Sequence, residues 1–222
     1  MSESNKYLWI YNIFITVLLG FLLYQNYSDS NVLRVKGIVI EDANGKERIL
    51  IGAPIPQAYN RIRTDTTRVI EEWGRFFPDD YLSYYEKYNH NTNGILILDE
   101  TGHDRIAIGS LVPDPNIGPR IGPASGIMLN DQRGFERSGY SLINVNGQNR
   151  VVLGLDNPGG TEGISLVLLE DGTSGLTIGG GAKSIFLGRA DSSYNYDGDS
   201  NFNGLRIHQA GQEDTILNSE NN

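Results

Sequence analysis

The chain has 222 residues, a formal net charge of -9, 27 glycines and no cysteine. This length allows one sizeable domain with short appendages, and the missing cysteine excludes disulfides, cysteine-based zinc sites and thiol catalysis. The acidic balance argues against a nucleic-acid partner, because binding to phosphates needs a basic stripe.

The N-terminal segment has the features of a membrane anchor. Residues 1–6 form a short tail, and residues 7–27 carry no charged side chain. An apolar helix of about 20 residues crosses a bilayer core, and aromatic residues at both ends of this segment are typical of interfacial belts. We therefore predict a transmembrane helix at 7–27, followed by a linker at 28–32. A cleaved signal peptide is the alternative, but the apolar run is long and no small-residue cleavage site follows it.

Three segments, at 37–52, 94–109 and 139–154, can be overlaid without a gap. Each begins and ends with glycine and has an Asx residue, a glycine three positions later and an arginine three positions after that. These structural repeat positions are Asp42, Gly45 and Arg48, then Asp99, Gly102 and Arg105, and then Asn144, Gly147 and Arg150.

Each repeat has the pattern of a β-hairpin. Apolar residues alternate on both sides of an Asx-x-x-Gly turn, and this glycine is expected to have positive φ. We expect a four-residue turn that pairs Asp42 with Gly45 and places Glu47 on the apolar face. Equivalent registers group Ile38, Ile40, Ile49 and Ile51 in the first copy, Ile95, Ile97, Ile106 and Ile108 in the second, and Tyr140, Leu142, Val151 and Leu153 in the third. The repeated arginine either pairs within the stack or forms a cation ladder for an anionic ligand.

An aromatic-rich insert at 55–92 separates the first hairpin, at 33–54, from the rest. Pro54 and Pro56 stop the strand. A short helix is expected at 66–75, and the Pro-Asp-Asp segment at 78–80 is expected to cap a second one that runs through Tyr88. The insert is either a lid that buries its rings or a docking surface, where Tyr and Trp are favoured. The candidate partner-binding residues are Trp73, Phe76, Phe77, Tyr81, Tyr84, Tyr85 and Tyr88.

Residues 93–217 form the β-repeat region, with a truncated copy at 126–137, degenerate copies beyond it and a polar tail at 218–222. The expected fold class is mainly β, with repeated β-hairpins in a solenoid-like or stacked sheet behind one transmembrane helix. Stacked hairpins leave open sheet edges, which favour pairing with another copy. We therefore expect a homo-oligomer.

Motifs for ligands and catalysis are weak. Asp197, Asp199 and Asn201 place oxygen atoms at alternate positions, as calcium loops do, but Phe202 stands where such a loop has glycine. Calcium is therefore a minor alternative, and no other cofactor is expected. The three histidines have no catalytic partner at a recognisable spacing.

The unit Asp-x-x-Gly-x-x-Arg-apolar-x-apolar-Gly, behind an apolar N-terminal helix, resembles a group of bacterial membrane-anchored envelope proteins that carry strings of such units. The resemblance covers most of residues 33–217, except the insert, and implies a repeat architecture and an envelope location. It brings no activity with it.

These features together predict a non-catalytic structural or binding subunit of a bacterial cell-envelope assembly. The N-terminus is expected in the cytoplasm and the bulk of the chain outside the cell membrane, with other envelope proteins as partners. The alternative is a membrane-tethered module that binds carbohydrate or a calcium-dependent ligand, or, less favoured, a glycan-active enzyme. Such an enzyme would need polar side chains converging in a pocket.

Overall fold

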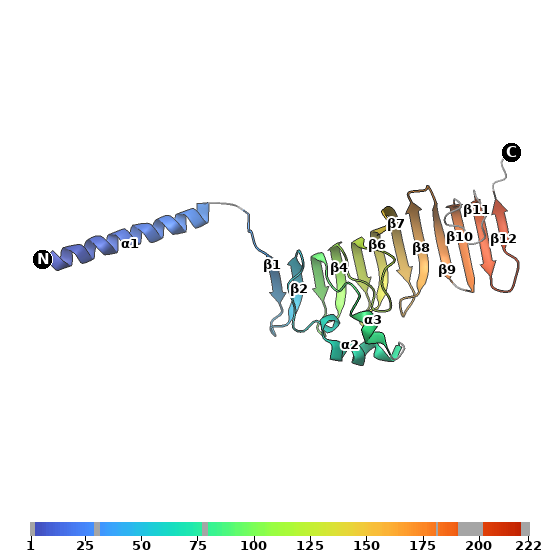
Figure 1. The fold of residues 1–222 in the computed structure, drawn as a ribbon, viewed down its shortest axis with the longest axis horizontal. Coiled ribbons are helices and arrows are strands. Elements are labelled where there is room, and N and C mark those ends of the chain that lie inside the picture. Colours follow the sequence, from blue (N-terminus) through green and yellow to red (C-terminus); the bar gives the residue numbers. More distant parts are fainter. Residues whose placement is uncertain (1–2, 29–31, 77–79, 181, 191–201, 219–222) are drawn as a thin grey trace. The chain divides into compact units, whose positions relative to one another are not determined.

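The computed structural model describes residues 3–28, 32–76, 80–180, 182–190 and 202–218 (Figure 1). The chain divides into two compact units, Met1–Val35 and Lys36–Asn222. The first unit contains helix α1 (Glu3–Ser28). Within it, Asn5–Gln25 is long and apolar enough to cross a membrane, with a mean hydropathy of 1.8. The predicted apolar helix is therefore confirmed as a candidate membrane span.

The second unit is built on one antiparallel sheet of twelve strands, each paired with its neighbours in sequence (Figure 1). The mainly β fold of consecutive hairpins is confirmed, and the sheet does not close on itself. The strands are β1 (Gly37–Glu41), β2 (Glu47–Gly52), β3 (Asn93–Leu98), β4 (Asp104–Ser110), β5 (Ala124–Asn130), β6 (Glu136–Val145), β7 (Gln148–Asp156), β8 (Glu162–Leu169), β9 (Ser174–Gly180), β10 (Lys183–Ala190), β11 (Phe202–Gln209) and β12 (Thr215–Asn218).

The Asp-x-x-Gly segments form the expected turns. The amide of Asp42 donates to the carbonyl of Lys46 (2.9 Å), and the amide of Gly45 donates to the carbonyl of Asp42 (3.0 Å). Amides of Asn44 and Lys46 donate to the Asp42 carboxylate and hold its pKa below the usual value. The predicted positive φ is confirmed at all three repeat glycines, with φ of +74° at Gly45, +92° at Gly102 and +84° at Gly147.

The predicted pairing of Asp42 with Gly45 is wrong. Ile40 pairs with Ile49, and a bulge then sets Glu41 opposite Glu47. The shift by two positions keeps each isoleucine on its predicted face, because side chains alternate with a period of two. Glu47 instead points toward the insert, where its carboxylate accepts from the amides of Tyr59 (3.0 Å) and Asn60 (3.2 Å).

The third copy, at 139–154, has a different turn. Val145 pairs with Gln148, so Asn146 and Gly147 alone form the turn, and both have positive φ. Two such residues make the tight turn that matches strand twist, and the four-residue turn predicted here is wrong. The structural counterpart of the first two turns begins at Asp131, whose amide donates to the carbonyl of Phe135 (2.8 Å).

Two of the repeat arginines, Arg48 and Arg105, and Arg137 of the truncated copy link successive hairpins. Nε of Arg48 donates to the carbonyl of Leu98 (3.1 Å), that of Arg105 to the carbonyl of Asn130 (3.1 Å), and that of Arg137 to the carbonyl of Asp156 (3.0 Å). Each acceptor directly precedes the Asx residue of the next turn. Arg48 and Arg105 also lie 3.2 and 3.8 Å from the aspartates of their own turns. This geometry supports the structural interpretation of these arginines.

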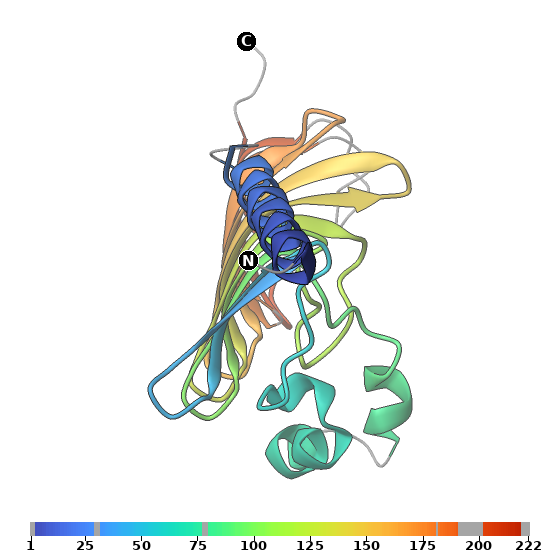
Figure 2. The ribbon, with the colours of Figure 1, turned by 90° about the vertical axis from the view of Figure 1, so that its left-hand side faces the viewer.

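The insert lies on one side of the sheet (Figure 2). It contains the short 3-10 turns η1 (Ile62–Thr64) and η2 (Gly74–Phe76) and the helices α2 (Thr66–Trp73) and α3 (Tyr81–Tyr85). The Asp65 side chain caps α2 by accepting from the amides of Thr67 and Arg68. Both helices are shorter than expected: α2 passes into a 3-10 turn at Gly74, and α3 ends at Tyr85.

Candidate functional site

One face of the sheet carries two rows of almost entirely apolar side chains, which together we call the open face. Each row has one residue from every strand, because the hydrogen-bonded partners follow one another from β1 to β12. The first row is Ile38, Ile51, Ile95, Ile108, Ile127, Tyr140, Leu153, Leu166, Leu176, Leu187, Leu205 and Leu217. The second is Ile40, Ile49, Ile97, Ile106, Leu129, Ser138, Leu155, Ile164, Ile178, Ile185, Ile207 and Thr215.

These rows contain no charged residue, and all members except Ser138 and Thr215 are Ile, Leu or Tyr. Among the described residues they are largely uncovered, with Leu166 53% and Tyr140 57% exposed. Antiparallel sheets with one wet face usually place polar residues there. The open face departs from that rule along the whole length of the sheet.

The opposite face is covered where the insert crosses it. Leu50, Leu96 and Ala107 are 0% exposed, and Met128 is 1% exposed. They form one cluster with Ile55 of the insert. A second cluster places Trp73 and Tyr85 of the insert with Phe135, next to the third Asp-x-x-Gly turn.

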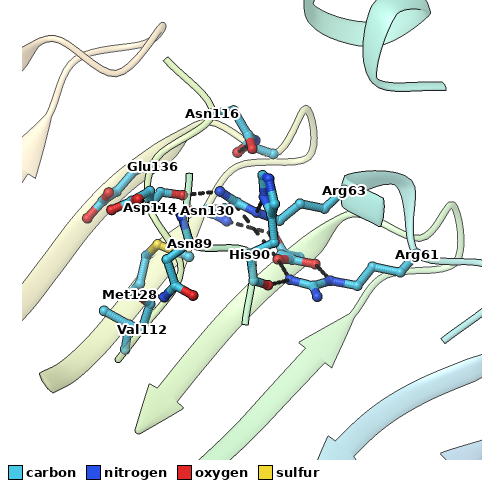
Figure 3. A network of polar contacts seen from close by, with 12 residues as sticks. Arg61, Arg63, Asn89, His90, Val112, Asp114, Asn116, Met128, Asn130 and Glu136 are labelled. Carbon is cyan, nitrogen blue, oxygen red and sulfur yellow. Dashed lines mark hydrogen bonds and ion pairs between the residues drawn. The ribbon is translucent and has the colours of Figure 1, made fainter. Parts of the chain in front are cut away.

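A buried ion pair joins the insert to the sheet beneath it (Figure 3). Nε and Nη2 of Arg61 lie 2.7 and 2.6 Å from the two carboxylate oxygens of Asp104, and both side chains are nearly inaccessible. Burial alone would raise the pKa of Asp104, but the charge and hydrogen bonds of Arg61 outweigh it and lower that pKa. Asp104 therefore stays ionised near neutral pH and is held by its pairing with Arg61.

Arg63 and His90 extend this network (Figure 3). Nε of Arg63 lies 3.2 Å from Nδ1 of His90, and Nε2 of His90 lies 2.8 Å from the carbonyl of Tyr85. A neutral ring with its proton on Nε2 satisfies both contacts. Burial and the charge of Arg63 lower the pKa of His90 to about 4. His90 is therefore a neutral hydrogen-bonding group.

The loop between β4 and β5 is held by hydrogen bonds and an ion pair to the insert and to β6. Arg120 pairs with Glu136 at 2.8 Å, and the Asp114 carboxylate accepts from the amides of Asn89 (2.8 Å) and Arg120 (3.1 Å). Asn116 donates to the carbonyl of Gly134 (2.6 Å). These groups bond to one another and to the backbone, so the network fixes the insert and its neighbouring loop.

The candidate partner-binding rings divide into buried and exposed groups. Trp73 and Tyr85 are 2% exposed and Tyr81 is 6% exposed. The indole of Trp73 donates to the carbonyl of Arg133 (2.7 Å), and the hydroxyl of Tyr81 donates to the carbonyl of Asn116 (2.7 Å). These three rings pack as the lid alternative expects.

The exposed rings of the candidate set are Phe76, at 49%, and Tyr84, at 56%. Tyr88 is half-buried against the second cluster, which contains Trp73, Tyr85 and Phe135. Phe77 lies outside the described residues, as do the calcium candidates Asp197, Asp199 and Asn201. In the part of the chain that the structure describes, no three His, Asp or Glu side chains gather as metal ligands would.

Sequence reasoning grouped the apolar residues of each hairpin correctly but did not identify the open face as a surface. Alternation alone does not say which face is covered, since Leu50 and Leu96 on the other face are equally apolar. The available signal was a pair of Ile or Leu residues two positions apart in nearly every strand.

No protein-family model, no curated protein and no solved structure matches this chain.

Proposed function

We propose that this protein is a non-catalytic, membrane-anchored interaction subunit whose contact surface is the open face of its sheet. The observation that carries the proposal is the pair of rows across twelve strands, in which every residue except Ser138 and Thr215 is Ile, Leu or Tyr. In this proposal α1 crosses the cell membrane with its N-terminus in the cytoplasm. The sheet then works outside the membrane, in the cell envelope.

The size of the open face supports this role. A CH2 group corresponds to about 30 Å² of surface, so a fully exposed Leu or Ile side chain presents roughly 120 Å². With side chains such as Leu153 41% and Leu187 54% exposed, the two rows present on the order of 1,000 Å². The largest apolar patch on a typical monomer covers about 300–600 Å², and larger patches mark contact sites.

The insert supports the same function from the other side of the sheet. It covers the opposite face over β2 to β5 and is fixed there by the Arg61–Asp104 pair. The guanidinium of Arg61 and the carboxylate of Asp104 bond to each other and tie the insert to β4. The insert then holds the sheet while the open face makes contact.

Cysteine labelling in intact membranes tests whether the open face is covered there. The natural chain has no cysteine, so single variants report on single positions. Leu153→Cys probes the open face and Val39→Cys the opposite face, and the natural residues are 41% and 40% exposed. A polar maleimide should label Leu153→Cys much more slowly than Val39→Cys in membranes, and the difference should vanish in denaturant.

Equal labelling rates in intact membranes would contradict the proposed function, because the open face would then be as accessible as an ordinary surface. The same preparations test the anchor: the chain should stay in the membrane pellet after an alkaline wash and keep residues 7–27. A soluble protein beginning beyond Gln25 would contradict the anchor.

A further inference from the structure

We infer that the open face pairs with the open face of a second copy of this chain, so that two sheets pack into a sandwich. This inference rests on the proposed function and names its partner. Four features of the open face favour a second copy: its area, its regular spacing, its lack of charge and the anchor.

The area is sufficient for a stable dimer. A standard interface buries about 800 Å² on each partner, and the open face presents on the order of 1,000 Å². Permanent homodimer interfaces are also more apolar than other interfaces and resemble a core cut in half. A face made almost entirely of Ile and Leu side chains fits that class.

The open face is also complementary to itself. Its side chains repeat at the spacing of neighbouring strands, about 4.8 Å, and two sheets stack about 10 Å apart with their strands at about 30°. A two-fold axis between the sheets sets each apolar row against the same rows of the other copy. With Leu166 and Leu187 more than half exposed, each sheet supplies one inner layer of such a core.

Charge points the same way. Two copies of a chain with net charge -9 repel each other, but neither apolar row holds a charged residue. The copies can therefore approach through this face without setting like charges directly opposite each other, an arrangement that costs several kcal/mol.

A lipid surface is the less favoured occupant. Faces that lie on membranes combine apolar side chains with lysines and arginines that attract anionic lipids. This chain has 18 basic and 27 acidic residues, so an anionic membrane surface repels it. Tethering two copies in one membrane instead raises their local concentration and favours pairing.

Cross-linking in intact membranes tests this inference on the full-length chain. Tyr140 lies in β6, near the middle of the sheet, and is 57% exposed. We expect Tyr140→Cys to form a covalent homodimer with a short bis-maleimide whichever way the two sheets run. Tyr59→Cys, which replaces a residue of the insert that is 90% exposed, should give no homodimer.

A charge variant shows that the open face causes the pairing. Leu153→Asp, introduced into Tyr140→Cys, should lower the yield of cross-linked dimer by at least about tenfold, because two carboxylates would be forced together. Val39→Asp in the same background is the matched control on the opposite face and should leave the yield unchanged. The far-UV circular dichroism of Leu153→Asp should match that of the parent, which separates lost pairing from lost folding.

The outcomes separate this inference from the proposed function. A Tyr140→Cys product that contains another protein, or slow labelling without any protein cross-link, would overturn the second copy while leaving a covered open face. If no protein is cross-linked, labelling of Leu153→Cys can be repeated in vesicles that contain only the purified chain and lipid. Slow labelling in these vesicles would identify lipid as the occupant of the open face. Labelling of Leu153→Cys as fast as Val39→Cys would overturn both.

Discussion

Leu96 in β3 and Leu166 in β8 are both leucines in strands of the same antiparallel sheet, yet Leu96 is 0% exposed and Leu166 is 53% exposed. Leu96 lies on the face that the insert crosses, and Leu166 lies on the open face. Both sit in strands with alternating apolar residues, so local pattern does not separate them. The difference shows that coverage by a segment outside the repeat decides which leucine belongs to a core.

The two faces also differ in how polar groups are used. The covered face includes a buried network around Arg61 and Asp104, which ties the insert down through bonds of fixed geometry. Along its two apolar rows, the open face has only Ser138 and Thr215 as polar members. The covered face therefore binds its own insert through specific polar bonds, whereas the open face is suited to contact with another flat apolar surface.

The largest expected effect is on the covered face, at the buried ion pair. Arg61→Ala should lower the free energy of unfolding by about 3–5 kcal/mol, because it leaves the Asp104 carboxylate buried without its partner. Replacing both residues with leucine should cost less than the single change, since no buried charge remains. Urea unfolding monitored by Trp fluorescence measures both. A loss below about 1 kcal/mol for Arg61→Ala, the size typical of an exposed pair, would show that the pair is not buried in solution.

The leucine pair sharpens the comparison directly. Leu96→Ala should cost about 2–5 kcal/mol, as buried large-to-small changes do. In a monomer, Leu166→Ala should cost clearly less, because much of its side chain already meets solvent. If the open face pairs with a second copy, the effect of Leu166→Ala should depend on protein concentration. Equal, concentration-independent costs would show that the two faces are alike in solution.

Substitutions at two turn glycines, Gly45 and Gly102, test whether the insert contacts the second turn. Both have positive φ, so alanine should cost about 1–2 kcal/mol at either position. At Gly102 an added Cβ would also clash with the carbonyl oxygen of Asn60, whereas at Gly45 it meets nothing within 4 Å. Gly102→Ala should therefore destabilise more than Gly45→Ala in thermal melts. Equal losses would mean that the insert does not rest on the second turn.

A pH dependence of stability is expected from His90. Its pKa in the folded chain is about 4, below the ordinary value of 6.5, because of burial and the charge of Arg63. The unfolded chain binds the proton first, so this stabilisation is complete above pH 6.5 and is lost as the pH falls to about 4. His90→Gln should lose less stability over that window than the natural chain.

Asp156 changes stability with pH in the opposite direction. The quantity to measure is therefore the difference in unfolding free energy between the natural chain and His90→Gln at each pH. Burial and the nearby Glu136 and Glu162 raise the pKa of Asp156 to about 6. The folded chain then binds this proton first, and acidification favours folding between about pH 6 and 4. Both proteins share this contribution, so it cancels. Parallel pH profiles for the two proteins would rule out a neutral, buried His90.

The sequence alone determined the apolar N-terminal helix, the run of hairpins and the side of each strand on which its apolar residues lie. These features follow from local chemistry: an uncharged stretch of membrane length, alternation with a period of two, and glycines where φ must be positive. The pairing of strands was missed by two positions because the loop from Asp42 to Lys46 holds one more residue than expected and the bulge next to Glu41 adds a second. The apolar residues kept their predicted faces because the shift was even, whereas Glu47, next to the bulge, did not.

Only the tertiary structure decided which face is covered and where the buried charges meet. Arg61 and Asp104 are 43 residues apart in the sequence, and neither belongs to a motif that announces the other. Residues 55–92 could equally have crossed the other face, since Ile51 and Leu50 are both apolar and alternate on the same strand. The path of the insert across the sheet made Leu50 part of a core and left the rows of Ile and Leu behind it as a surface.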